Sequence, residues 1–169
     1  MPTLLFFFID ILYSHKETYA NKYLGGGIMN NNKIERIERA VKFLRENPVQ
    51  YLATVGIDEK AKCRPFMFLL EKEGKLFFCT NNKKSVYKQM EKNPYIEICT
   101  SAKDFTWIRI SGKAVFTKDI KIKEECVSIP MIKNIYKSAD NPIFEVFSIK
   151  NAEIKILDVT GTIKEELSL

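Results

Sequence analysis

From Phe77 to Pro94 the chain reads FFCTNNKKSVYKQMEKNP, an apolar run that ends in polar residues and turns through two lysines into a helical pattern. Val86 and Met90 stand four residues apart, as on one face of a helix, and the proline ends the pattern. The first N–H groups of a helix lack intrahelical partners, and the lysines add positive charge there. The stretch therefore predicts a strand, a turn and a short helix that together can hold a phosphate group.

Strand-like segments lie on both sides of this stretch and are joined by short polar turns. Apolar spacings of three and four predict an earlier helix from Ile34 to Leu44, and helical periodicity returns at 119–138 with a break at Pro130. Without βαβ alternation, the pattern favours a mainly β fold, a closed or nearly closed antiparallel barrel of six to seven strands decorated by helices. The predicted strands are 49–57, 61–70, 75–80, 95–101, 106–117, 143–149 and 152–158.

The first 28 residues differ from the rest of the chain. An apolar run at 4–9 is broken by Asp10, so it is too short to span a bilayer, and no basic segment or cleavage site indicates a signal peptide. Three glycines at 25–27 stand just before Met29. A purine-rich ribosome-binding site would give such glycine codons if it were translated by mistake. We hypothesise that the natural start is Met29 and that 1–28 is a non-native or disordered extension; the alternative is a real, flexible one. Residues 29–169 are expected to form a single domain.

Composition excludes several classes of function. The net charge of +6 is spread among acids rather than gathered in one tract, which argues against nucleic-acid binding. The four cysteines show no C-x-x-C spacing, so they are predicted to be reduced, buried thiols of a cytoplasmic protein, with no metal site. The only histidine is His15, so histidine-based catalysis is disfavoured from Met29 onward. Glycine-rich dinucleotide and P-loop motifs are absent.

An ordered set of motifs resembles the pyridoxamine 5'-phosphate oxidase-like flavoproteins over residues 33–158. Each motif alone is weak, and the specificity lies in their order. The motifs are VQYLAT at 49–54, RPF at 64–66, LFFCT at 76–80, KSVYKQM at 84–90, NP at 93–94 and WIRISG at 107–112.

This resemblance implies the FMN-binding split-barrel fold and a homodimer with two FMN molecules at the subunit interface. It implies that one strand lies along the isoalloxazine ring and that a strand end with the following lysines holds the phosphate. The ring residues carried over are Arg64, Pro65, Phe66 and Met67, and the phosphate residues are Thr80, Asn81, Lys83 and Lys84. Trp107 and Arg109 share one strand face by period two, so they are expected to stack near the second subunit's flavin.

Each candidate also has a plain structural interpretation. Lys83 and Lys84 could be solvated charges at a helix start, although cations there oppose the helix dipole. Arg64 could be an edge-strand charge that discourages aggregation. Thr80 could be a helix N-cap, and Trp107 could be ordinary core.

The function implied by the resemblance is an FMN-dependent oxidoreductase that passes electrons from NAD(P)H to an unknown small-molecule acceptor. The flavin would carry the chemistry, so no catalytic side chain is predicted. The chain lacks the C-terminal segment, containing arginine and histidine, by which true pyridoxamine phosphate oxidases grip their product, so that activity is not expected. The alternative is a non-catalytic carrier or sensor that binds a flavin or the deazaflavin F420.

Overall fold

The computed structural model describes residues 31–169, so the prediction for residues 1–28 lies outside the described part of the chain. Residues 35–169 form one compact unit that contains every strand given below. In the part described, no helix is long and apolar enough to cross a membrane. The helices are α2 (Asn31–Glu46), α3 (Ser85–Lys92), α4 (Ile120–Ser128) and α5 (Pro130–Tyr136), and the strands are β1 (Gln50–Val55), β2 (Ala61–Phe66), β3 (Leu70–Lys72), β4 (Lys75–Asn81), β5 (Tyr95–Ser101), β6 (Trp107–Thr117), β7 (Phe144–Leu157) and β8 (Ile163–Ser168).

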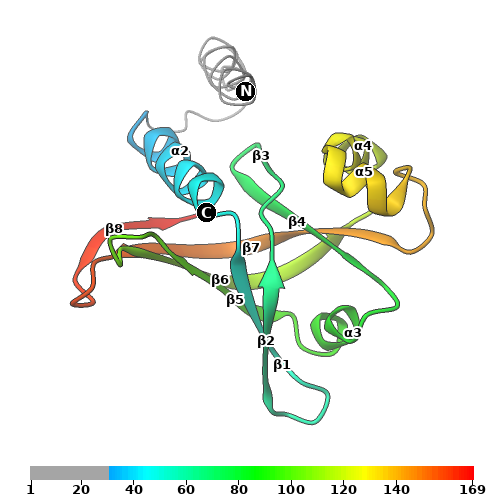
Figure 1. The fold of residues 1–169 in the computed structure, drawn as a ribbon, viewed down its shortest axis with the longest axis horizontal. Coiled ribbons are helices and arrows are strands. Elements are labelled where there is room, and N and C mark those ends of the chain that lie inside the picture. Colours follow the sequence, from blue (N-terminus) through cyan, green and yellow to red (C-terminus); the bar gives the residue numbers. More distant parts are fainter. Residues whose placement is uncertain (1–30) are drawn as a thin grey trace, which may run out of the picture. The chain divides into compact units, whose positions relative to one another are not determined.

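The strands form one antiparallel sheet, and its two ends do not pair with each other. Its order is β2-β1-β5-β6-β7-β4-β3, with β8 added to β7. The end strands β2 and β3 are consecutive in the chain and are joined by residues 67–69. The mainly β, split-barrel prediction is thus confirmed, and the sheet stays open rather than closed. Figure 1 shows α4 and α5 together at one side of the sheet, α3 beyond β4, and α2 beside β8.

The strand pattern after α5 differs from the prediction. The two strands expected at 143–149 and 152–158 are a single strand, β7, whose first half pairs with β4 and whose second half pairs with β8. Asn151, inside β7, has a φ of 52°, and the register with β6 shifts between Ser111 and Lys113. This bulge breaks the alternation that a continuous strand would show. The strand expected at 61–70 ends at Phe66, and a separate short strand, β3, follows at Leu70–Lys72. The sequence carries no signal for the charged strand β8. With two predicted strands merged into β7 and with β3 and β8 added, the sheet has eight strands, against the six to seven predicted.

An aromatic cluster fills the inside of the curved sheet. Phe147 lies at its centre, with ring centroids 5.7 Å from Phe78, 5.7 Å from Phe116 and 5.9 Å from Phe66. Phe78 and Phe147 are fully buried. Because successive side chains of a strand point to opposite faces, the neighbours of these residues face the other way.

The helices α4 and α5 cover that other face. Phe77 of β4 and Val146 of β7 pack there with buried residues of the two helices, including Cys126 and Tyr136. Burial of apolar surface on both faces of β4 and β7 explains why these strands lack a regular alternation of polar and apolar residues.

The bulge in β7 requires a glycine in the neighbouring strand. A Cβ at Gly112 would lie 2.6 Å from Cγ2 of Ile149 and 2.9 Å from the carbonyl oxygen of Lys150. Gly112→Ala is therefore expected to destabilise the protein by about 1–3 kcal/mol through steric strain. The measurement is the midpoint of urea unfolding. The adjacent Ser111→Ala serves as a control, and a variant pair with equal midpoints would contradict the close approach.

Candidate functional site

The turn between β4 and α3 is tightly fixed by hydrogen bonds. The Oδ1 atom of Asn81 accepts from the backbone N–H of Lys83 at 2.7 Å, and its carbonyl accepts from the N–H of Lys84 at 2.9 Å. The N–H of Asn82 donates to the carbonyl of Ile143 at 3.1 Å, just before β7. An Asx turn of this kind fixes a loop without needing a core beneath it. The turn therefore holds Lys83 and Lys84 at a defined place on the surface.

The start of α3 is electropositive. Lys84 is its N-cap, contributes no side-chain hydrogen bond to the helix, and is followed by a first turn without acidic residues. No ion pair involves Lys83 or Lys84 within residues 31–169. Two unpaired ammonium groups beside the free N–H groups of a helix favour an anion. The alternative interpretation of Thr80 as the helix cap is wrong, since the cap lies at Lys84.

Thr80 is a buried polar residue without a partner. It is 2% exposed, and its Oγ1 atom has no hydrogen-bond partner in the described part of the chain. It is the residue before the Asn81 turn, at the end of β4. An unsatisfied buried hydroxyl is costly and rare, and it often marks a place where a ligand or water completes the bonding.

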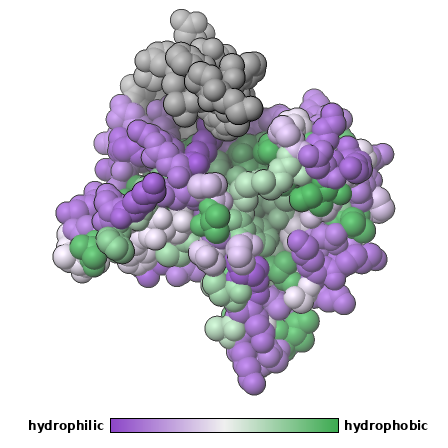
Figure 2. Space-filling model, viewed as in Figure 1, coloured by the Kyte–Doolittle hydropathy of each residue, from purple (hydrophilic) through white to green (hydrophobic). Residues whose placement is uncertain are grey.

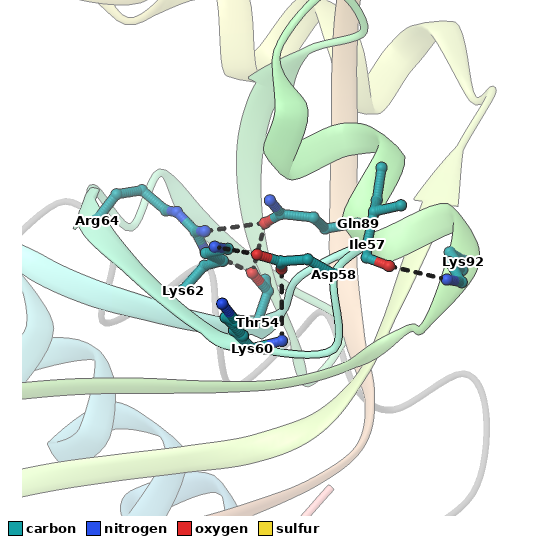
Figure 3. Close-up of polar contacts among 8 residues, drawn as sticks. All are labelled: Thr54, Ile57, Asp58, Lys60, Lys62, Arg64, Gln89 and Lys92. Atoms are coloured by element: carbon teal, nitrogen blue, oxygen red, sulfur yellow. Dashed lines mark hydrogen bonds and ion pairs between the residues drawn. The ribbon is translucent and has the colours of Figure 1, made fainter.

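Arg64 is held inside the protein by neutral acceptors (Figure 3). Its Nη1 atom donates to the Oγ1 of Thr54 at 2.7 Å and to the carbonyl of Leu52 at 3.1 Å, and its Nη2 atom donates to the Oε1 of Gln89 at 2.9 Å. The Thr54 hydroxyl also donates to the same Gln89 oxygen at 2.7 Å. Burial lowers the pKa of Arg64 from its usual value. The guanidinium therefore joins β2, β1 and α3. β2 is an edge strand, as the alternative interpretation assumed, but the guanidinium is hydrogen-bonded inside the protein and is not a free charge at the edge.

Thr54 and Gln89 were missed by the sequence analysis. Both are buried polar residues, 5% exposed each. The available signal was position: Thr54 falls on the buried side of a strand with Gln50 and Leu52, and Gln89 lies beside the apolar Met90 and three residues after Val86. Neither residue type indicates burial by itself.

The remaining ring candidates lie on different faces. Phe66 points toward the aromatic cluster, whereas Met67 is partly buried against the residues that α4 and α5 cover, as is Cys79. Pro65, next to Arg64 in β2, points to the outer face of the sheet. Figure 2 shows apolar side chains gathered in a hollow between α2 and the α4–α5 pair.

Trp107 and Arg109 form the expected stacked pair. The guanidinium carbon of Arg109 lies 5.7 Å from the ring centroid of Trp107, and its Nε atom lies 3.9 Å from the carboxylate of Glu97. The indole N–H of Trp107 donates to the carbonyl of Asp158 at 3.2 Å. In the sheet register, Arg109 of β6 lies opposite Cys99 of β5, and Cys99 lies opposite Tyr51 of β1. Tyr51 in turn lies opposite Pro65 of β2. The pair therefore shares the outer face with Pro65 and lies on the opposite side of the sheet from Arg64.

A family profile described as pyridoxamine 5'-phosphate oxidase matches residues 37–158, which include the β4–α3 turn and Arg64. The chain belongs to this family. A nimc/nima family protein from Clostridium acetobutylicum is 36% identical, with a TM-score of 0.73 over 81% of this chain and 94% of that chain. No curated protein matches the sequence.

More distant solved structures share the fold of this pyridoxamine 5'-phosphate oxidase family member. General Stress Protein 26 from Bacillus anthracis is 21% identical, with a TM-score of 0.62 over 79% of this chain and 98% of that chain. A heme binding protein from Mycobacterium smegmatis is 12% identical, with a TM-score of 0.62 over 84% of this chain and 60% of that chain.

The residues of this family member fit a phosphorylated, ring-bearing cofactor. The unpaired lysines and the unsatisfied Thr80 hydroxyl suit a phosphate, and the partly buried Met67 and Cys79 suit an apolar ring. Burial raises the pKa of both Cys79 and Cys126 to about 12, although Lys84 lowers the pKa of Cys79 slightly. Both thiols therefore stay protonated at neutral pH and are poor nucleophiles. The arrangement is suited to binding rather than to nucleophilic catalysis by these cysteines.

Gln89 offers a direct test of the Arg64 network. Gln89→Leu keeps the approximate shape of the side chain but leaves Nη2 of Arg64 and the hydroxyl of Thr54 without their shared acceptor. We expect a loss of about 2 kcal/mol in the free energy of unfolding. Urea unfolding measures it, with the exposed neighbour Lys88→Ala as the control. If Gln89→Leu is as stable as the control, the network does not hold α3 to the sheet.

Proposed function

We propose that the protein is an FMN-dependent oxidoreductase that passes electrons from NAD(P)H to a small-molecule acceptor. The observation that carries the proposal is the β4–α3 turn of a pyridoxamine 5'-phosphate oxidase family member. Within residues 31–169, the buried Thr80 hydroxyl before this turn has no hydrogen-bond partner, and the two lysines that follow it have no ion pair. The four cysteines are free, which suits a reducing compartment such as the cytoplasm. Their predicted burial is wrong for Cys63, which is exposed, and complete only for Cys126.

In this proposal the chain's residues bind and orient the cofactor. Lys83, Lys84 and the first N–H groups of α3 would hold the phosphate, with Asn81 fixing the turn beneath it. The segment from Arg64 to Met67 would lie along the ring, and the Thr54–Gln89 pair would keep Arg64 in position. When bound, the flavin supplies the hydride chemistry, so the protein needs no charged nucleophile of its own.

We also propose that the protein is a homodimer whose interface includes the outer face of β1, β2, β5 and β6. Tyr51 is 50% exposed and Tyr95 is 60% exposed on this face. A groove of about 630 Å³ lies beside them, with an apolar floor that includes Ala53 and Val55. Exposed aromatic side chains around an apolar groove are typical of protein interfaces. Trp107 and Arg109 share this face, so dimerisation would bring them toward the partner's cofactor.

The visible absorption spectrum tests the central proposal. The purified protein is mixed with FMN, freed of excess, and treated anaerobically with NADPH or NADH. We expect flavin bands near one per subunit that bleach on addition of the nicotinamide. Bands that persist would contradict a reductase and favour a carrier or sensor. A protein that does not retain FMN would favour F420 as the cofactor.

Lys84 is expected to contribute directly to flavin retention. Lys84→Glu places a negative charge against the phosphate, so the dissociation constant for FMN should rise by at least about tenfold. Quenching of flavin fluorescence in an FMN titration measures it. Lys88→Glu makes the same charge change on an exposed residue of α3, and an equal effect from both variants would show that only overall charge matters.

Dimerisation and flavin binding are expected to be coupled. Tyr51→Glu introduces a charge on the proposed interface, so we expect a monomer by size-exclusion chromatography with light scattering and a loss of bound FMN. Ile135→Glu, on the exposed side of α5, is the control and should change neither property. A Tyr51→Glu monomer that stays loaded with flavin would refute a site built by two subunits.

A further inference from the structure

We propose that a second cleft, between β4 and α4, binds an organic anion with an apolar body. This β4–α4 cleft has a volume of about 560 Å³, within the range of small-molecule sites. Its rim carries Lys75, Lys118 and Lys121, and its wall includes Phe77, Val115 and Ile122. None of these residues belongs to the proposed flavin site.

The cleft lies at the opposite end of β4 from the β4–α3 turn. β4 begins at Lys75, beside the cleft, and ends at Asn81 in the turn. Six residues of extended strand separate the two by about 20 Å. A phosphate held at the turn therefore cannot also reach the lysines of the cleft.

The apolar wall favours an organic ligand over a bare inorganic ion. Phe77 and Ile122 are 5% and 8% exposed and form a fixed part of the core under α4. Val115 stands beside them and is 43% exposed, so a ligand can still cover it. Removing that surface from water stabilises a bound hydrocarbon or ring, and an inorganic anion would gain nothing from it.

The distribution of charge favours a negative ligand. The acidic residues at the cleft gather around Lys72, which also lines it. Glu125 forms an ion pair with Lys72, and Glu125, Glu73 and Asp119 all raise the pKa of Lys72. Asp119 is also occupied as the N-cap of α4, where its carboxylate accepts from a backbone N–H.

The three rim lysines are left without such partners. Lys75, Lys118 and Lys121 have no ion pair within residues 31–169. All three are exposed at the mouth of the cleft. A carboxylate, sulfonate or phosphate group can therefore pair with them while its apolar body lies on the wall.

The test uses anilinonaphthalene sulfonate, a fluorescent aromatic anion, titrated into the full-length protein saturated with FMN. Lys118→Glu changes the charge of the rim, and Val115→Trp fills the cleft without changing charge. Lys103→Glu makes the same charge change in the exposed β5–β6 turn, away from the cleft. Thermal unfolding of each variant checks that the fold is kept.

We expect saturable binding to the wild type, weakened about tenfold or more by each cleft variant and unchanged in Lys103→Glu. Equal affinities in all four proteins would overturn the proposal, because the dye would then be bound elsewhere. Absence of saturable binding to the wild type would also overturn it. The same titration without FMN must give the same ranking, so this result does not depend on flavin binding.

Discussion

The bend of β7 is the constraint on which the arrangement of the sheet depends. One strand serves two partners, β4 with its first half and β8 with its second, and it changes direction where Asn151 takes a left-handed conformation against Gly112. The turn is possible only because residue 112 has no side chain to separate the backbones. Before this bend, the first half of β7 holds β4 beside α4 and α5, and the end of β4 carries Thr80 and the following turn.

A second constraint joins the two parts of the candidate site. Arg64 comes from an edge strand and α3 from the connection between β4 and β5, and a single oxygen of Gln89 binds the guanidinium while accepting from Thr54. A partly buried guanidinium without a carboxylate partner must be satisfied by neutral acceptors, and each acceptor lost leaves a desolvated donor. The network thus couples the position of the Arg64–Met67 segment to that of α3 and the β4–α3 turn before it.

Two clefts in the described part of the chain differ in chemistry as well as in place. The groove on the outer sheet face, which we propose as part of a contact with a second copy, has an apolar floor with Glu59, Glu97 and Glu153 at its edge. The β4–α4 cleft has a rim of lysines and suits an anion. The strand β4 runs from this cleft to the β4–α3 turn, so a ligand in one place would contact the strand that carries the other.

The sequence by itself determined the fold class, the helices and most strands, and the β4–α3 turn. Those features rest on local signals: alternating apolar residues, an Asn before lysines, and prolines that end helices. Prediction failed at β3, β7 and β8. The single strand predicted at 61–70 is β2 followed by a separate β3. A bulge hides the continuity of β7, and the charged residues of β8 lack an apolar alternation.

Only the tertiary structure decided which candidates lie together. It placed Arg64 against Thr54 and Gln89, and it put Trp107 and Arg109 on the opposite face. Among the residues it describes, it also left the Thr80 hydroxyl buried without a partner. Such relations depend on strand register and packing between segments far apart in the chain, and no local pattern of residues encodes them.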